Sequence, residues 1–208
     1  MHFAELLRLV HDEPLFETGL LLAGDVDQAN IQRQLSRWTQ VKKLIQVRRG
    51  LYAIAPPYQK RCPHPFLTAN LLVRPSYVSL QSALAYHGLI PEEVPITTSV
   101  TSSRPAGHHT PLGGFLYRHV KPSWLWGSEP IEVVTDQTVW VASPEKALLD
   151  LIYLEAGADN PLFLEALRLQ NLDLDMEKLA TWARDSPKLT RAVGHIAHLA
   201  REEPDEEV

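Results

Sequence analysis

Cysteine is almost absent from this chain, and long apolar runs are absent altogether. The 208 residues include one cysteine, Cys62, so no internal disulfide can form, which is typical of a protein in a reducing cytoplasm. No run approaches the roughly 18 to 20 apolar residues that a membrane-spanning helix needs. Glu5, Asp12 and Glu13 interrupt the basic-then-apolar order of a secretory signal. The sequence therefore predicts a cytoplasmic globular protein without membrane contact.

The sequence also lacks the motifs of several large enzyme classes. GxxxxGK[ST], GxGxxG, GxSxG and HExxH do not occur. His108 and His109 are adjacent, but they lie in a predicted loop bounded by Gly and Pro, with no carboxylate or second cysteine nearby to complete a metal site. We expect no catalytic residues, no metal and no cofactor.

Acidic residues are missing from one long stretch of the chain. No Asp or Glu occurs between Asp27 and Glu92, and the formal charge of −5 combines +9 in this window with −14 elsewhere. A basic segment of this kind indicates a surface that binds polyanions, although it could also be an ordinary solvated face. The nine basic residues of the window are Arg33, Arg37, Lys42, Lys43, Arg48, Arg49, Lys60, Arg61 and Arg74.

The first 57 residues have the pattern of a winged helix-turn-helix domain. Apolar spacing predicts a helix over residues 3–11 and a second helix over residues 17–23, which Gly24 ends. Asp27 can cap a third helix over residues 28–40, because its side chain can accept from the free amides of the first turn. Ile31, Leu35 and Trp38 make the buried stripe of this third helix.

The opposite face of the third helix has the composition of a recognition helix. It carries long amides and guanidinium groups, which pair with purine edges in the major groove, and it carries no acid that would repel phosphates. Lysines just beyond the helix suit the phosphate backbone. The residues predicted to contact DNA here are Gln28, Asn30, Gln32, Arg33, Ser36, Arg37, Gln40, Lys42 and Lys43.

A basic hairpin follows the third helix. Residues 44–47 and 51–54 are two β-prone runs, and Arg48, Arg49 and Gly50 form the turn between them. Two arginines at a hairpin tip are expected of a wing that lies on the phosphate backbone or in a minor groove. A surface hairpin of any α+β domain is the simpler alternative, but the order of helices and hairpin favours DNA binding.

Residues 62–201 are predicted to form a second, α+β domain with a small sheet and C-terminal helices. Helices are expected over residues 66–73, 79–87, 162–169, 176–184 and 188–200, with a long helix starting at residues 143–145. Strands are expected over residues 96–102, 115–120, 131–135 and 139–142. Residues 202–208 read as a solvated acidic tail.

Two features of the second domain have alternative interpretations. Glu145, Lys146 and Asp150 could form the acid-base or metal site of a nuclease-like enzyme, but Lys146 and Asp150 are i,i+4 neighbours and are predicted to be an ordinary surface pair. The hydroxyl-rich residues 98–107 could bind an anion or could be a strand end running into a solvated loop. Lys60, Arg61, Arg74, Arg104 and Arg118 are further candidates for contacts with nucleic-acid backbone or a partner.

Several segments resemble one protein family. Residues 48–53 (RRGLYA) resemble the R-x-G-x-Y wing of the AbiEi abortive-infection antitoxins. The resemblance covers roughly residues 1 to 155, in the order expected of the family. The other segments that carry it are residues 77–84 (YVSLQSAL), 87–91 (HGLIP), 101–104 (TSSR), 115–119 (FLYRH) and 142–150 (ASPEKALLD).

The resemblance implies an antitoxin that represses its own operon. Its winged helix-turn-helix would bind double-stranded operator DNA at inverted repeats, and its second domain would neutralise a nucleotidyltransferase-type toxin, as a functional partner that need not form a stable complex. A different hypothesis is an interaction protein that binds such a toxin directly, with the basic region serving that partner.

Overall fold

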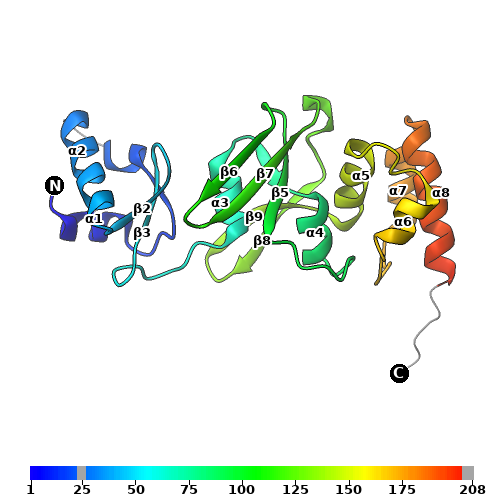
Figure 1. Cartoon of the computed structure of the whole chain (residues 1–208), viewed down its shortest axis with the longest axis horizontal. Coiled ribbons are helices and arrows are strands. Elements are labelled where there is room, and N and C mark those ends of the chain that lie inside the picture. Colours follow the sequence, from blue (N-terminus) through cyan, green and yellow to red (C-terminus); the bar gives the residue numbers. More distant parts are fainter. Residues whose placement is uncertain (23–26, 203–208) are drawn as a thin grey trace, which may run out of the picture.

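The computed structural model describes residues 1–22 and 27–202, and within these residues the protein is α+β with eight α-helices and two sheets (Figure 1). An N-terminal unit, a central sheet and a C-terminal group of helices follow one another along the long axis (Figure 1). In chain order the elements are α1 (Phe3–Val10), β1 (Phe16–Glu17), the 3-10 helix η1 (Thr18–Leu22), α2 (Gln28–Gln40), β2 (Leu44–Arg48), β3 (Leu51–Ile54), α3 (Pro65–Leu72), β4 (Ser76–Val78), α4 (Leu80–Tyr86), β5 (Ile96–Thr101), β6 (Ala106–Thr110), β7 (Gly113–His119), the 3-10 helix η2 (Pro122–Trp124), β8 (Ser128–Val134), β9 (Gln137–Ala142), α5 (Pro144–Leu154), α6 (Pro161–Ala166), α7 (Met176–Ala183) and α8 (Pro187–Glu202).

The N-terminal unit, residues 1–22 and 27–55, packs its helices against a three-stranded antiparallel sheet of order β1-β3-β2. Ile31, Leu35 and Trp38 of α2 are buried as the periodicity predicts, and they pack with Leu6 and Val10 of α1. The helix predicted over residues 17–23 is wrong for the part that is described. Residues 16–17 pair with β3 instead, and residues 18–22 form the tighter helix η1. Ala23 and Gly24 lie outside the described residues.

The predicted cap and turn of the N-terminal unit are confirmed. The Asp27 carboxylate accepts from the amides of Ala29 at 2.9 Å and Asn30 at 3.2 Å, so α2 begins where the sequence indicates. Strands β2 and β3 pair antiparallel, and Gly50 takes a φ of +85° in the turn between them, a conformation that favours glycine. The hairpin therefore has the predicted position, and its register shifts between Gln46 and Arg48.

The central sheet is larger than predicted, with six strands in the order β6-β7-β5-β4-β9-β8. Strand β4 has three residues, and the sequence does not predict it because so short a run has little periodicity. The predicted loop at His108 and His109 is also wrong. Both histidines belong to the edge strand β6, where they pair with Phe115 and Gly114 of β7, so tertiary pairing decides a segment whose composition resembles a loop.

Helices cover both faces of this sheet. Successive side chains of a strand point to opposite faces, and two neighbours on β7 show which helix lies on each side. The Tyr117 hydroxyl donates to the Ala69 carbonyl of α3 at 2.6 Å, whereas Arg118 donates to the Leu154 carbonyl of α5 at 3.3 Å. Helix α3 thus lies on the side of the N-terminal unit, and α5 lies on the opposite side.

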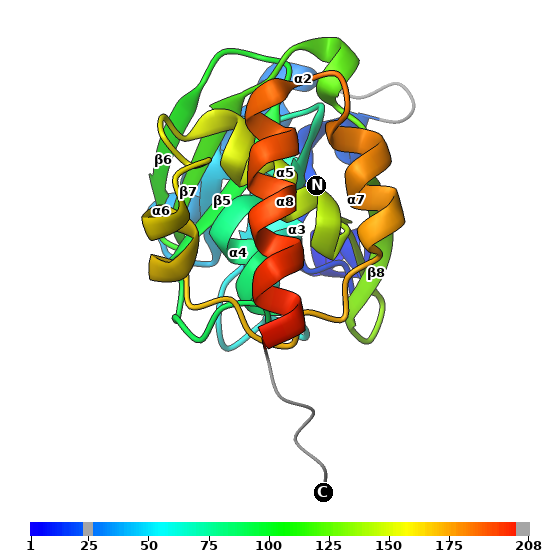
Figure 2. The ribbon, with the colours of Figure 1, turned by 90° about the vertical axis from the view of Figure 1, so that its right-hand side faces the viewer.

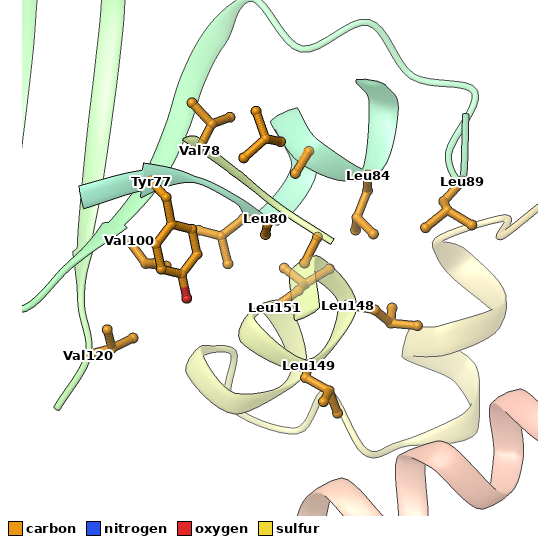
Figure 3. Packing of buried hydrophobic residues seen from close by; sticks show 14 of the residues in the cluster. Tyr77, Val78, Leu80, Leu84, Leu89, Val100, Val120, Leu148, Leu149 and Leu151 are labelled. Atoms are coloured by element: carbon orange, nitrogen blue, oxygen red, sulfur yellow. The ribbon is translucent and has the colours of Figure 1, made fainter. Parts of the chain in front are cut away.

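Helix α5 is the centre of the larger core. It is buried on nearly every side, and Leu148, Leu149 and Leu151 are fully inaccessible. Figure 3 shows Leu151 near Leu80 and Tyr77, which come from the α4 and sheet side of this core. Helix α8 runs across α5, flanked by α6 and α7 (Figure 2), so the predicted C-terminal helices form an outer layer.

The N-terminal unit packs directly against the second domain. Leu15, Val47, Leu51 and Ala53 of that unit belong to the same buried cluster as the core of the central sheet. The end of the predicted acidic tail, residues 203–208, lies outside the described residues, while residue 202 still belongs to α8. Among the described residues, none of the helices combines the length and apolar character needed to cross a membrane.

Candidate nucleic-acid interface

The outward face of α2 is polar except for Ala29, and it is free of acids. The residues predicted to read DNA from this helix are all exposed, and they lie opposite the buried stripe that anchors α2 to α1. Arg33 has its guanidinium 3.9 Å from the Asp27 carboxylate, a distance that leaves it open to solvent. The exposed set is Gln28, Asn30, Gln32, Arg33, Ser36, Arg37 and Gln40.

The two lysines after α2 differ from each other. Lys42 is exposed and takes a positive φ of 57° where the chain leaves the helix. Lys43 is half-buried, and its ammonium lies 4.7 Å from the centre of the Phe3 ring and 5.7 Å from that of Tyr58. Lys43 therefore joins α1 to the connector through cation–π contacts, and Lys42 is the freer of the two toward solvent.

The two arginines of the hairpin tip also differ. Arg49 is exposed beyond the strands, as a wing contact requires. Arg48 is half-buried: it donates to the Glu17 carboxylate of its own unit at 3.3 Å and to the Leu71 carbonyl of the second domain at 3.1 Å. Arg48 thus forms a contact between the two halves of the protein that its sequence position does not reveal.

The remaining basic residues of the acid-free window meet acids from outside it. Lys60 pairs with Asp12 at 2.9 Å, and Arg61 pairs with Asp136 at 2.6 Å. The Lys60 hydrogen bond is the main cause that lowers the pKa of the Asp12 carboxyl. The basic segment is therefore partly neutralised by acids that folding brings next to it, and its most exposed cations are those of α2, Lys42 and Arg49.

The two other candidate arginines have separate surroundings. Arg104 is exposed in the segment between β5 and β6, and β6 is the edge strand at the opposite end of the central sheet from β8. Arg118 donates to the Glu155 carboxylate at 2.6 Å and to the Leu154 carbonyl, so it fastens β7 to the end of α5. The structure does not bring either of them together with α2.

A second cluster of charged groups lies inside the larger core, and here one prediction is wrong. Lys146 and Asp150 are not a surface pair, because both side chains are completely buried and bonded to each other. The Asp150 carboxylate also accepts from Ser79 at 2.7 Å, Tyr77 at 3.1 Å and the Trp124 indole at 2.7 Å. Four donors thus converge on one carboxylate and connect β4, η2 and α5.

Aromatic rings surround the Lys146 ammonium. The centres of the Trp124 and Trp126 rings are both 4.6 Å from Nζ, and that of Tyr77 is 5.7 Å away. Burial lowers the pKa of Lys146, while the Asp150 carboxylate opposes that change. These aromatic rings and the Asp150 carboxylate together replace the water that the Lys146 ammonium loses on folding.

Comparison with known proteins finds no match: none of the protein-family models matches the chain, and no curated protein matches it significantly. In the described part of the chain, no group of three or more His, Cys, Asp or Glu side chains is arranged to hold a metal ion.

Glu145 belongs to a neighbouring network that holds α7 against α5. Its carboxylate accepts from Ser143 at 2.8 Å and from Lys178 at 3.0 Å. Burial by itself would raise the pKa of Glu145, but these hydrogen bonds outweigh it and the pKa is lowered from 4.5. Glu145, Lys146 and Asp150 are therefore all occupied in structural contacts, with Lys146 and Asp150 inaccessible to an external phosphate.

A Lys178→Met variant is expected to make folding less sensitive to acid. Because the pKa of Glu145 is lower in the folded than in the unfolded chain, Glu145 stabilises the fold above about pH 4.5 and loses that contribution as the pH falls. Urea unfolding between about pH 3 and pH 6 should give a steeper fall in the unfolding free energy for the wild type than for the variant. Parallel curves, or the same flattening in the exposed control Lys121→Met, would contradict this assignment.

The sequence does contain a signal that predicts burial of the Lys146–Asp150 pair. Apolar residues occur on almost every side of α5, and a helix that is apolar all round is a core helix rather than a surface helix. A Lys and an Asp four residues apart on such a helix must be buried together and paired. The spacing alone, without the surrounding apolar pattern, suggested a surface pair.

Proposed function

We propose that this protein binds double-stranded DNA through a winged helix-turn-helix formed by its N-terminal unit. The observation that carries the proposal is the exposed, acid-free face of α2, with Arg33 and Arg37 at its centre and Arg49 on the adjacent hairpin. Guanidinium and amide groups on an exposed helix suit base edges in the major groove. An arginine at a hairpin tip suits the backbone beside it.

The order and pairing of the elements support this assignment. A helix, a short strand, two helical segments and a two-stranded hairpin follow one another, and β1 pairs with β3 at the edge of the hairpin. Strand β3 is buried at every position, so the hairpin is anchored firmly at its base while Arg49 stays in solvent. A rigid base is what a wing needs to hold its tip against DNA.

We further propose the role of an antitoxin and autorepressor in a toxin–antitoxin operon. The resemblance of several segments to the AbiEi antitoxins supports this role, and it makes a nucleotidyltransferase-type toxin the functional partner of the second domain. Inverted repeats in the operator would place two copies of the protein on DNA about one helical turn apart.

The proposal predicts strongly salt-dependent binding to the DNA upstream of the protein's own gene. If about six phosphates are neutralised, the logarithm of the binding constant should fall with the logarithm of the salt concentration at a slope of about −5. Fluorescence anisotropy with a labelled duplex, over a salt series, measures this slope. Arg49→Ala should bind more weakly and should make the slope shallower by about 0.9, because one phosphate contact is lost.

Exposed arginines outside the interface provide the control. Arg184 lies at the end of α7, in the C-terminal group of helices, so Arg184→Ala should leave the slope unchanged. Binding that does not respond to salt, or equal effects of the two substitutions, would argue against the proposed interface.

A further inference from the structure

Two arginines from different parts of the chain converge on one carboxylate beside the hairpin. Arg48 of β2 donates to one oxygen of Glu17 at 3.3 Å, and Arg74, which follows α3 in the second domain, lies 3.8 Å from the other oxygen. The side chains are 37%, 44% and 58% exposed for Arg48, Glu17 and Arg74, so an anion in solution can approach all three.

We infer that this arginine pair is a second phosphate site for DNA, occupied in the free protein by Glu17. A backbone phosphate would displace the carboxylate and bind between Arg48 and Arg74, so the second domain would contribute directly to DNA binding. The inference rests on the proposed function, since it adds one backbone contact to the interface of α2 and Arg49.

The chemistry of the site allows exchange of one anion for another. A guanidinium binds a carboxylate and a backbone phosphodiester with the same fork of donors, because each presents two oxygens that share one negative charge. The Arg48 guanidinium also donates to the carbonyls of Arg49 and Leu71, contacts that do not depend on which anion it binds. Half-exposed ion pairs of this kind contribute little stability and are easily displaced.

The surroundings of Arg74 leave room for a strand of DNA. Arg74 lies on the rim of a groove of about 740 Å³ between α3 and β9, whose wall includes the half-exposed Trp140. Arg48 ends β2 and directly precedes Arg49 in the chain, so a backbone that contacts Arg49 passes close to the pair. The site therefore extends the interface of the N-terminal unit toward this groove.

Arg74→Ala in the full-length protein tests the contact. With the labelled duplex from upstream of its gene, this variant should bind more weakly, and its salt slope should be shallower by about 0.9, as expected for the loss of one phosphate. Arg184→Ala removes the same charge from an exposed position and should leave the slope unchanged. An unchanged slope for Arg74→Ala, with a wild type that binds, overturns the inference and leaves the proposed function standing.

Glu17→Gln tests whether the Glu17 carboxylate competes with a DNA phosphate for the two arginines. Removal of the competing charge should tighten DNA binding by about two- to fivefold relative to Glu13→Gln, which removes the same charge from an exposed position nearby. If Glu17→Gln weakens binding instead, Glu17 positions the hairpin and is not displaced, which also overturns the inference. Failure of the wild type to bind any duplex would overturn both the inference and the proposed function. Thermal unfolding of each variant verifies that the variant is folded.

Discussion

A Lys146→Met variant is expected to unfold with a free energy about 3–5 kcal/mol below that of the wild type, because it leaves a buried carboxylate without its counter-ion. Asp150 would keep its bonds from Ser79, Tyr77 and Trp124 but lose the only cation among the described residues that contacts it. The vacated space lies between the rings of Trp124 and Trp126, so the methionine would fit sterically. Urea or guanidinium unfolding measures the loss.

The double variant Lys146→Met/Asp150→Asn separates charge from packing. An asparagine keeps the shape of Asp150 and an acceptor for the indole of Trp124, but it needs no counter-ion. The double variant should therefore be more stable than Lys146→Met alone, a non-additive result that shows coupling between the two side chains. Lys121→Met, at an exposed position, should change stability by less than about 0.5 kcal/mol. If single and double variants lose the same amount, the charge of Asp150 is not the cause.

Replacement of both Arg33 and Arg37 by alanine is expected to lower the affinity for the specific duplex by about thirtyfold or more, since each bidentate contact with a base contributes about 1–3 kcal/mol. Both side chains extend from the exposed face of α2, and neither has contacts in the core. The variant should therefore fold normally and lose discrimination between its operator and an unrelated duplex. Anisotropy with both duplexes measures the ratio of the two affinities.

The matched control carries the same change in net charge. Arg184 and Arg201 are exposed on the C-terminal helices, far along the chain from α2, and their double replacement by alanine should preserve the specificity ratio (Figure 1). Comparable losses in both double variants would mean that only the overall charge matters, and the assignment of α2 as a recognition helix would fail.

Local sequence was sufficient to predict α2, the hairpin and the start of α5. Asp27 and Ser143 cap their helices through side-chain bonds to amides two to three residues ahead, and Gly50 supplies the turn of the hairpin. These signals involve neighbours in the chain, so they are visible without any tertiary structure. The same holds for the exposed face of α2, because its periodicity follows from the helix itself.

The errors arose where a segment depends on a distant partner. The helix predicted over residues 17–23 does not begin at residue 17, because residues 16–17 pair with β3, and Gly19 in the following segment weakens a helix further. His108 and His109 lie in a strand only because β7 pairs with them. Short segments carry too little intrinsic preference to resist such pairing.

In the acid-free window, too, some features follow from local sequence and others depend on residues that folding brings together. Residue order and helical period are enough to predict that nine cations share a stretch without acids and that α2 presents an exposed basic face. Which of these cations stay unmatched depends on folding, which brings Glu17 to Arg48 across 31 residues. Outside the window, folding likewise buries Lys146 with Asp150, since the pairing of charges depends on distance in space and on access to water.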